Sequence, residues 1–447
     1  MASFYIENLG CSKNQVDAEL MAASLKNHGW QYSPDAPQAA DIIIINTCGF
    51  IKSAQKEAVD TILNTRKQFP HKKIIAAGCL AQRWPQELSK LIPEIDSVFS
   101  SRIPQQISQA AAAALAGIEP VYTETEELPE RHDFFGFKRS VYLKISDGCN
   151  HNCRFCAIPL IKGRLVSRPQ HNVLKEAAKL LENGAFELNL IAQDLASYGQ
   201  DQGNQRGLIE LLEALLAVKK PREEFWIRLL YLHPDNIPNE LLQLMAAEPR
   251  ILPYLDIPFQ HASAQVLRKM GRRGTSQSYL ALIENIRNTL PAAVIRSTFL
   301  TGHPGEGRAE FDELLRFQEA ARLDWLGVFA WSREEGTAAA RDKGALGARL
   351  NAPRAERRRQ IIAEQQEPIT RERMRRFIGQ TLTALIEEPV SGEHCAIGRA
   401  YLHAPEVDGN IVVHTTSENH KMLMSGTVVE VKITGSSGFD LLGSAEP

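Results

Sequence analysis

Short apolar runs alternate with amphipathic stretches through the first third of the chain. Asp41–Asn46 contains four consecutive isoleucines, and such a run predicts a strand that is buried on both faces. Shorter runs at Phe4–Asn8 and Lys73–Ala77 predict two further strands. Three segments with helical spacing follow these strands: Val16–Asn27, Ser53–Lys67 and Gln82–Leu91. This alternation predicts a doubly wound α/β domain, in which helices cover the faces of a parallel sheet.

A second series of strands and helices occupies the middle of the chain. Amphipathic segments such as Val173–Glu182 and Ile209–Val218 predict helices that separate its strands. Six apolar runs predict the strands themselves: Val141–Ser146, Glu187–Ala192, Trp226–Leu232, Tyr254–Ile257, Val294–Leu300 and Leu326–Ala330. Six strand–helix units over about 200 residues predict an open or partial (β/α)6 barrel.

The last quarter of the chain changes character twice. Pro353–Arg376 is rich in arginine and predicts one long helix. After Phe377, short runs of Val, Ile and Leu alternate with Gly and Ser turns, which predicts a small all-β barrel. We therefore expect three domains and one polar, acidic linker: an N-terminal domain (1–122), the linker (123–134), the partial barrel (135–376) and the β-barrel (377–447).

The bulk composition is that of an ordinary globular protein. Of 447 residues, 44% are hydrophobic and 23% are charged, and the net charge of -2 disfavours a protein that coats nucleic acid. The N-terminus lacks the basic and apolar regions of a signal peptide, and no apolar run has the length of a membrane span. Seven cysteines in so long a chain indicate a reducing compartment, so we expect a cytoplasmic protein.

Three of the seven cysteines stand in one short loop, Cys149-Asn-His-Asn-Cys153-Arg-Phe-Cys156. A tight loop can bring all three sulfurs to one inorganic centre. A structural zinc ion takes four protein ligands, whereas three thiolates on a cubane iron–sulfur cluster leave one iron open to a small molecule. The spacing therefore favours an iron–sulfur site that performs chemistry over a zinc site that holds the fold together.

A second cysteine triad is spread over the N-terminal domain. Cys11, Cys48 and Cys79 each follow one of the three predicted strands. Ligands of an open parallel sheet bind beyond the carboxyl ends of its strands, so these thiols are expected to face one crevice. We infer a second three-thiolate site; the alternative is three buried cysteines that act as small hydrophobic residues. Cys395 stands alone and is interpreted as an incidental thiol.

The cysteine loop resembles the signature of the radical S-adenosylmethionine superfamily, and the second triad is similar to that of its methylthiotransferases. The resemblance implies a [4Fe-4S] cluster on the Cys149–Cys156 loop, whose open iron binds S-adenosylmethionine. It also implies a second [4Fe-4S] cluster on the second triad and a C-terminal TRAM domain. One departure is His303, where the family more often has Phe. The resemblance spans nearly the whole chain and rests on residues 9–14 (LGCSKN), 46–51 (NTCGFI), 78–83 (GCLAQR), 259–261, 270–272 and 301–306.

The same resemblance implies a reaction. The first cluster would pass one electron to S-adenosylmethionine, and cleavage would give a 5′-deoxyadenosyl radical that takes a hydrogen from the substrate. The second cluster would provide the sulfur, and a second S-adenosylmethionine would provide the methyl group. The two sites must then face each other, with the N-terminal sheet over the barrel mouth. A flavodoxin or ferredoxin-type partner would supply the electrons.

Two branches of the family compete for this chain. One modifies isopentenyl-adenosine in tRNA, and the other modifies the β-carbon of an aspartate in small-subunit ribosomal protein S twelve. Residues 48–51 read Cys-Gly-Phe-Ile where the tRNA branch usually has Cys-Ser-Val-Arg, and residues 11–14 read Cys-Ser-Lys-Asn in place of Cys-Gln-Met-Asn. The segment 398–409 looks like the ribosomal-protein branch, which we therefore expect.

The charge of the last domain points the same way. From Phe377 onward, three Lys or Arg residues stand against nine Asp or Glu residues. Such a domain suits a basic ribosomal protein better than the phosphates of tRNA, unless the acidic residues simply form a solvated surface. A tRNA methylthiotransferase is the main alternative, and a non-catalytic, zinc-stabilised RNA-binding protein is a remote one.

Four further residues are candidates for contact with S-adenosylmethionine. Phe155 lies between two cluster cysteines, and Gln193, Arg228 and Gln260 lie near the carboxyl ends of barrel strands, where barrel enzymes place their sites. A structural role is about as good an interpretation for each. The arginines of 354–376 could meet ribosomal RNA, but a solvated helix face is the favoured interpretation.

Overall fold

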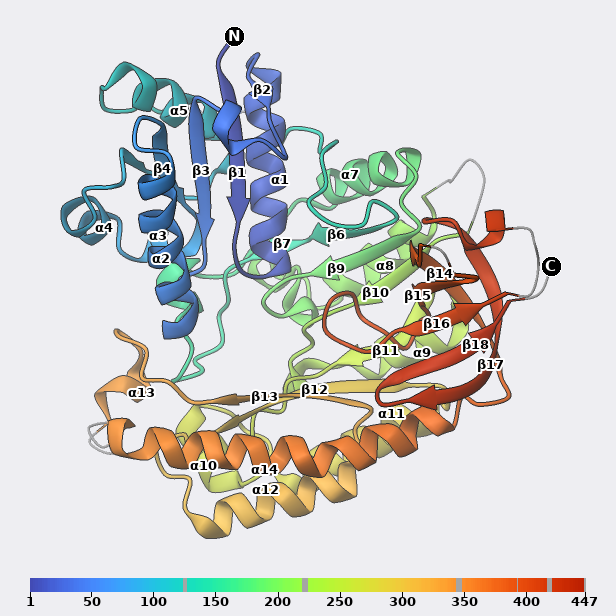
Figure 1. Ribbon diagram of the computed structural model, residues 1–447. Helices are drawn as coiled ribbons and strands as arrows, with labels where there is room; N and C mark the ends of the chain where they lie inside the picture. Colours follow the sequence, from blue (N-terminus) through green and yellow to red (C-terminus); the bar gives the residue numbers. More distant parts are fainter. Residues whose placement is uncertain (124–126, 219–223, 343–347, 392, 416–419, 446–447) are drawn as a thin grey trace.

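The N-terminal domain is built on a sheet of five parallel strands in the order β2-β1-β3-β4-β5 (Figure 1). The computed structural model describes residues 1–123, 127–218, 224–342, 348–391, 393–415 and 420–445, so part of the predicted linker, 124–126, lies outside them. The strands are Ser3–Asn8 (β1), Gln31–Tyr32 (β2), Ile42–Thr47 (β3), Lys73–Ala77 (β4) and Ser97–Val98 (β5). The helices are Ser12–Asn27 (α1), Lys52–Gln68 (α2), Gly78–Arg83 (α3), Pro85–Leu91 (α4) and Ile107–Ala116 (α5). The predicted parallel α/β architecture is confirmed.

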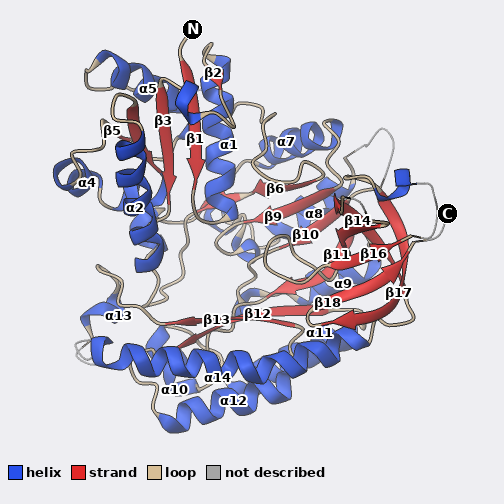
Figure 2. Cartoon of the chain, viewed as in Figure 1, coloured by secondary structure: helices blue, strands red, loops and turns tan. Residues whose placement is uncertain are grey.

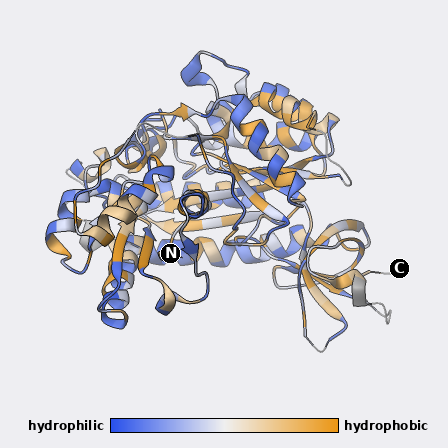
Figure 3. Cartoon of the chain, turned by 90° about the horizontal axis from the view of Figure 1, so that it is seen from above, coloured by the Kyte–Doolittle hydropathy of each residue, from blue (hydrophilic) through white to orange (hydrophobic). Residues whose placement is uncertain are grey.

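The isoleucine run of β3 forms the centre of this domain. Ile42 and Ile44 pack with Phe4 and α1 on one face, and Ile43 and Ile45 pack on the other face. All four side chains are buried, as a strand covered on both faces requires. Figure 3 shows the strands of this sheet as largely hydrophobic.

The predicted helix over 82–91 is instead two helices, α3 and α4, which meet at Trp84. Trp84 has φ −137° and ψ 59°, outside the helical region. Pro85 begins the second helix because a proline suits the first helical position, where its missing N–H is not needed. As a result Cys79 lies in the first turn of α3 and not in a loop.

The middle of the chain forms an open sheet of six parallel strands in the order β13-β12-β11-β10-β9-β6. The strands are Ser140–Lys144 (β6), Glu187–Ile191 (β9), Trp226–Leu229 (β10), Ile251–Asp256 (β11), Val294–Thr301 (β12) and Trp325–Ala330 (β13). The helices are Gln170–Glu182 (α7), Gly207–Leu216 (α8), Asn239–Ala247 (α9), Ala264–Met270 (α10), Ser276–Thr289 (α11) and Arg308–Ala321 (α12). A large apolar core joins the strands to these helices, and the predicted partial barrel is confirmed (Figure 2).

The long arginine-rich helix α14 (Ala348–Arg375) runs beside the edge of the open barrel, after the short helix α13 (Ala338–Arg341) (Figure 1). Arg358 is buried and pairs with Glu306 at 2.5 Å, and Arg373 and Arg376 both pair with Asp324. These arginines therefore fasten the helix to the barrel. Four other arginines of the segment, Arg354, Arg357, Arg371 and Arg375, are exposed, as the favoured solvated face predicts.

The C-terminal domain is a closed barrel of five strands in the order β14-β15-β16-β18-β17. Its strands are Thr381–Pro389 (β14), Cys395–Arg399 (β15), Ile411–His414 (β16), Val428–Ser437 (β17) and Asp440–Ser444 (β18). One apolar cluster joins Leu402 and Ile411 of this domain to Tyr254 and Trp325 of the open barrel. No helix among the described residues is long and apolar enough to span a membrane.

Candidate functional site

The Cys149–Cys156 loop follows the short strand Ser146–Asp147 (β7) and leads into the short helix Ile158–Ile161 (α6). The strand Val166–Ser167 (β8) comes after this helix and pairs with β7. The amide of Cys149 donates to the Gly163 carbonyl at 3.2 Å, and the amide of Cys156 donates to the Cys153 carbonyl at 3.1 Å. The sulfurs of Cys149 and Cys156 accept backbone N–H bonds at 3.4 Å from His151 and Ile158, respectively. The loop thus folds back on itself and gathers its three thiols.

His151 fastens this loop to the carboxyl ends of the barrel strands. Its Nε2 lies 2.7 Å from Oδ2 of Asp194, and its ring stacks on His233 with 4.0 Å between centroids. Asn236 also donates to Asp194 Oδ2, at 3.0 Å. Burial would raise the pKa of Asp194, but hydrogen bonds from His151 and Ser197 lower it to about 2. A permanently ionised carboxylate therefore holds the loop.

The second triad comes together at the carboxyl ends of β1, β3 and β4. Cys11 precedes the first turn of α1, Cys48 follows β3, and Cys79 opens α3. Asn14 links the three segments: its Nδ2 donates to the carbonyls of Leu9 and Thr47, both at 3.0 Å, and its Oδ1 accepts from the Cys79 thiol at 3.1 Å. The carboxyl ends of the three strands therefore lie side by side, as the predicted three-thiolate site requires.

Gly78 lets the backbone close up at this crevice. Its φ is +88°, and a Cβ at this position would lie 2.4 Å from the carbonyl oxygen of Thr47. Both the conformation and the close approach require glycine. The neighbouring Gly10, with φ +100°, would place a Cβ 2.9 Å from the Cβ of Cys48. The crevice is thus narrow enough to keep Cys11 and Cys48 close together.

Cys79 of the second triad lies at the junction of the N-terminal domain and the open barrel. It packs with Ala157, which directly follows Cys156, and with Ile161 of α6. Outside this contact, Arg83 pairs with Glu334 at 3.3 Å, and both side chains are almost completely buried. The two thiol sites are therefore neighbours although they belong to different domains.

Buried charges surround the same junction. Asp17 on α1 accepts hydrogen bonds from Lys144 and Lys162, and Asp147 lies 3.1 Å from Lys144. Burial raises the pKa of the Cys79 thiol to about 12, while the nearby Lys162 acts to lower it. A cavity of about 420 Å³ opens beside Lys144 and Lys162. The sequence offered one signal for this cluster, since Asp17 and Lys144 interrupt otherwise apolar segments.

Each cysteine triad offers three free thiols to an inorganic group. Among the described residues, no three His, Cys, Asp or Glu side chains converge as the ligands of one metal ion would. A cubane cluster spreads its sulfur ligands, because each binds a different iron. Burial also raises the pKa of Cys149 to about 11 and that of Cys156 to about 12, so binding iron would displace their protons. Three thiols in one loop are the ligands that an open-iron cluster takes.

Of the predicted cofactor residues, Phe155 lies within the cysteine loop, Gln193 contacts the strand that leads into it, and Gln260 follows β11. Phe155 packs edge-on against His303, with 6.3 Å between ring centroids. Gln260 adopts φ +67°, and its backbone bridges to Phe299. Gln193 donates to Asp147 at 3.0 Å, and its Oε1 is buried without a partner.

Arg228 lies elsewhere, and this position corrects its predicted role. It is completely buried, with its Nε 2.7 Å from Glu187 and its Nη1 2.7 Å from the carbonyl of Tyr401 in the C-terminal barrel. Arg399 of that barrel reaches the same Glu187 at 2.9 Å. Arg228 thus joins two domains in place of contacting S-adenosylmethionine.

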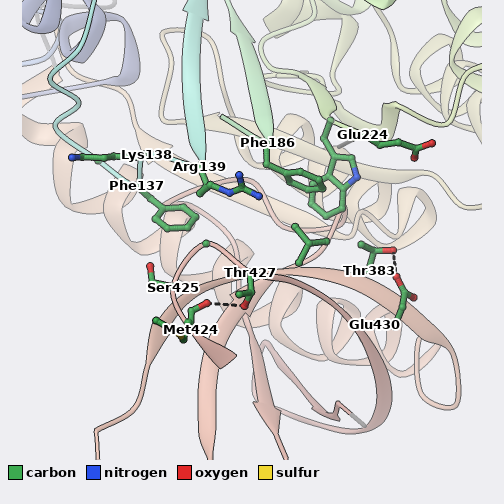
Figure 4. Close-up of a pocket in the computed structure, with 14 residues that line it drawn as sticks. Phe137, Lys138, Arg139, Phe186, Glu224, Thr383, Met424, Ser425, Thr427 and Glu430 are labelled. Carbon is green, nitrogen blue, oxygen red and sulfur yellow. Dashed lines mark hydrogen bonds between the residues drawn. The ribbon is translucent and has the colours of Figure 1, made fainter. Parts of the chain in front are cut away.

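A larger groove, about 1230 Å³, lies at the other end of this domain contact. Figure 4 shows Phe186 and Arg139 on one side and the loop around Met424 and Thr427 on the other. Phe186 directly precedes β9, and the cysteine loop lies at the opposite, carboxyl end of this strand. The groove therefore lies at the amino ends of the strands, away from both cysteine triads.

Comparison with known proteins agrees with this division of the chain. Residues 3–100 match the uncharacterized protein family UPF0004, 143–317 match the radical SAM superfamily, and 378–445 match the TRAM domain. A Treponema denticola protein called ribosomal protein uS12 methylthiotransferase RimO is 37% identical over 97% of this chain and 98% of its own length. A Moorella thermoacetica protein of the same name is 40% identical over 97% of each chain.

Solved structures show the fold alone. The radical S-adenosylmethionine methyltransferase TsrM from Kitasatospora setae superposes with a TM-score of 0.52 at 14% identity, covering 74% of this chain and 75% of its own. The cobalamin-dependent S-adenosylmethionine radical enzyme OxsB superposes with the same TM-score at 15% identity, covering 79% of this chain and 56% of its own. The arrangement of an α/β domain beside an open barrel therefore recurs in distant proteins.

Proposed function

Because the chain belongs to the RimO family of radical S-adenosylmethionine methylthiotransferases, we propose that it modifies ribosomal protein uS12 with two [4Fe-4S] clusters. The target is the β-carbon of one aspartate, where a methylthio group replaces a hydrogen. The observation that carries this proposal is the packing of Cys79 of the second triad against Ala157 and Ile161, the segment that follows the cysteine loop.

Proximity is what the reaction needs from the fold. A carbon that loses its hydrogen at one site must meet sulfur at the other site before it reacts elsewhere. Holding both centres around one substrate makes these steps effectively intramolecular. The buried Arg83–Glu334 pair and the Asp17 cluster hold the two domains together at this point.

The two triads have distinct tasks. Cys149, Cys153 and Cys156 would hold the cluster that binds S-adenosylmethionine, and the second triad would hold the cluster on the sulfur side. When bound, these groups supply the radical that removes hydrogen, the sulfur and the methyl group. Phe155 and His303 wall the first site with aromatic rings.

Further side chains orient and shield the sites. Gln193 presents a buried amide oxygen without a partner, which suits an N–H donor of the cofactor. Gln260 lies in the segment that follows β11, in a left-handed backbone conformation with φ +67°. The ionised Asp194 orients His151 and with it the cysteine loop.

The C-terminal barrel favours a protein substrate over tRNA. Of its three basic residues, Arg399 is buried between Glu187 and Glu387 and cannot reach a phosphate. Lys432 is exposed, and the side chain of Lys421 lies outside the described residues. A tRNA-binding face draws on several Lys and Arg side chains, whereas an acidic surface suits a basic ribosomal protein.

The electron donor is a flavodoxin or ferredoxin-type protein, and the work takes place in the cytoplasm, at or near the ribosome. The described cysteines are all free thiols, as a reducing compartment and iron binding both require.

The test is anaerobic reconstitution of the wild type and of three single variants with uS12, S-adenosylmethionine and a reductant. Cys153→Ala should abolish 5′-deoxyadenosine, whereas Cys48→Ala should spare it and stop methylthio insertion. The matched control is Cys395→Ala, a buried thiol outside both triads, which should behave as wild type. Methylthiolated product from both cluster variants would refute the two-cluster scheme.

Mass spectrometry also separates the alternatives. uS12 and tRNA from a strain that lacks the gene should be compared with those from its parent. Loss of the methylthio increment from tRNA alone would assign the chain to the tRNA branch. Zinc without iron in the anaerobic protein would support the non-catalytic alternative instead.

A further inference from the structure

Lys13 crosses the junction between the two domains. It lies in the first turn of α1, two residues after Cys11, and its Nζ lies 3.3 Å from the ring centroid of Tyr231. Tyr231 follows β10 at the barrel mouth, and its φ of 70° is unusual for a residue with a side chain. Both side chains are half-buried. A strained backbone conformation at Tyr231 therefore accompanies the placement of its ring against this ammonium.

Lys13 differs from the other cations at the same junction. Lys144 and Lys162 are both paired with Asp17 and Asp147. Arg296, which faces the barrel interior, lies 3.3 Å from both Asp256 and Asp408. In the described part of the chain, Lys13 has no carboxylate within salt-bridge distance, and its ammonium contacts the Tyr231 ring.

We propose that Lys13 and Tyr231 form a subsite that binds the side-chain carboxylate of the substrate aspartate. The ring engages one side of the ammonium and leaves its remaining N–H donors free for an anion. Partial burial weakens competition from water and strengthens an ion pair formed there. An ammonium has three rotatable donors, so it can follow a carboxylate that arrives on a flexible side chain.

The position of the subsite fits the proposed chemistry, on which this inference rests. In aspartate, the β-carbon is bonded directly to the side-chain carboxyl carbon. A cation that fixes the carboxylate therefore fixes the reacting carbon one bond away. Lys13 lies two residues after Cys11 of the sulfur-side triad, and its Nζ contacts Tyr231 at the end of a barrel strand, so it links the sulfur-side segment to the barrel mouth. Lys13 is thus a specificity residue that touches substrate but transfers no group.

The experiment compares steady-state kinetics of reconstituted wild type, Lys13→Met and Lys13→Arg on purified uS12. Lys13→Met keeps the length of the side chain and removes its charge, and it should raise KM for uS12 about tenfold, the effect of losing one hydrogen bond to a charged group. KM for S-adenosylmethionine and the iron content should stay unchanged. Lys13→Arg should recover most of the affinity. The matched control is Lys67→Met, an exposed lysine on α2, which should match wild type.

A second substrate tests the same contact on the wild-type enzyme, so the result does not depend on whether Lys13→Met folds correctly. uS12 in which the target aspartate is replaced by asparagine should bind wild type about tenfold more weakly, and Lys13→Met should bind both forms equally. Equal KM for wild type and Lys13→Met, with wild-type activity intact, would overturn this inference alone. Wild-type enzyme that leaves uS12 unmodified would overturn the proposed function and this subsite together.

Discussion

Glu187 is the residue whose replacement tests the junction of the open barrel and the TRAM domain most directly. It is completely buried, with Oε1 2.7 Å from Arg228 and Oε2 2.9 Å from Arg399. Glu187→Gln keeps the size of the side chain but leaves two buried guanidinium groups without this counter-charge. Breaking a buried ion pair from one side costs about 3–5 kcal/mol.

The pKa of Glu187 gives an independent magnitude. Burial would raise this pKa, but Arg399 and Arg228 lower it from 4.5 to about 2. A change of this size corresponds to about 3 kcal/mol of stability at neutral pH. Because the folded pKa lies below the unfolded value, the stabilisation is complete above about pH 4.5 and is lost as pH falls toward 2.

The assay is urea unfolding followed by tryptophan fluorescence at pH 6 and pH 8. Trp325 reports on this junction, since its Nε1 donates to the carbonyl of Leu402 at 2.8 Å. Glu187→Gln should lose about 3 kcal/mol at both pH values. Glu430→Gln, on the exposed face of the same domain, should stay within about 0.5 kcal/mol of wild type. A loss below about 1 kcal/mol, or one that differs between the two pH values, would refute the reasoning.

Three further predictions concern the cysteine sites. Asp194→Asn should free His151 and loosen the cysteine loop, because the lost charged hydrogen bond costs about 1.5–3 kcal/mol of unfolding free energy. Both the midpoint of thermal unfolding and the iron bound per chain should fall. Asn14→Ala should remove the link between the strand ends of the second triad, so iron content should fall while 5′-deoxyadenosine is still formed; full iron content would contradict this. Gly78→Ala should destabilise the N-terminal domain by more than about 1 kcal/mol in urea unfolding, because its Cβ would meet the Thr47 carbonyl at φ +88°, and wild-type stability would contradict the strain.

Both cysteine triads could be placed from the sequence because each depends on local pattern. Cys48 comes directly after the strand that contains the isoleucine run, so the pattern that predicts the end of the strand also predicts the position of the thiol. Parallel strands then bring their carboxyl ends to one edge without further information. The approach of Cys79 to α6 is different, since it depends on how two domains dock. The resemblance to known enzymes implied this contact, but strand pattern alone did not.

Arg228 shows why the remainder could not be predicted. Its neighbours Ile227 and Leu229 face the helices, so the alternation of a strand turns Arg228 into the barrel interior. The sequence does not say what fills that interior. The filling comes from Tyr401 and Arg399, about 170 residues later in the chain. The ion pairs of Arg358 and Arg373 escaped prediction for the same reason, because their partners Glu306 and Asp324 lie in other segments of the barrel.

Buried charge at both domain junctions has a consequence for the position of the active site. Asp17 with Lys144 and Lys162 joins the N-terminal domain to the barrel, and Glu187 with Arg399 joins the TRAM domain to it. Apolar junctions tolerate sliding, whereas a shifted junction of this kind leaves a buried charge unpaired at a cost of several kcal/mol. We infer that these ion pairs select one relative placement of the domains. That placement matters most at Lys162, which binds Asp17 and also lies near Cys79, so the contact that aligns the domains also aligns the thiols.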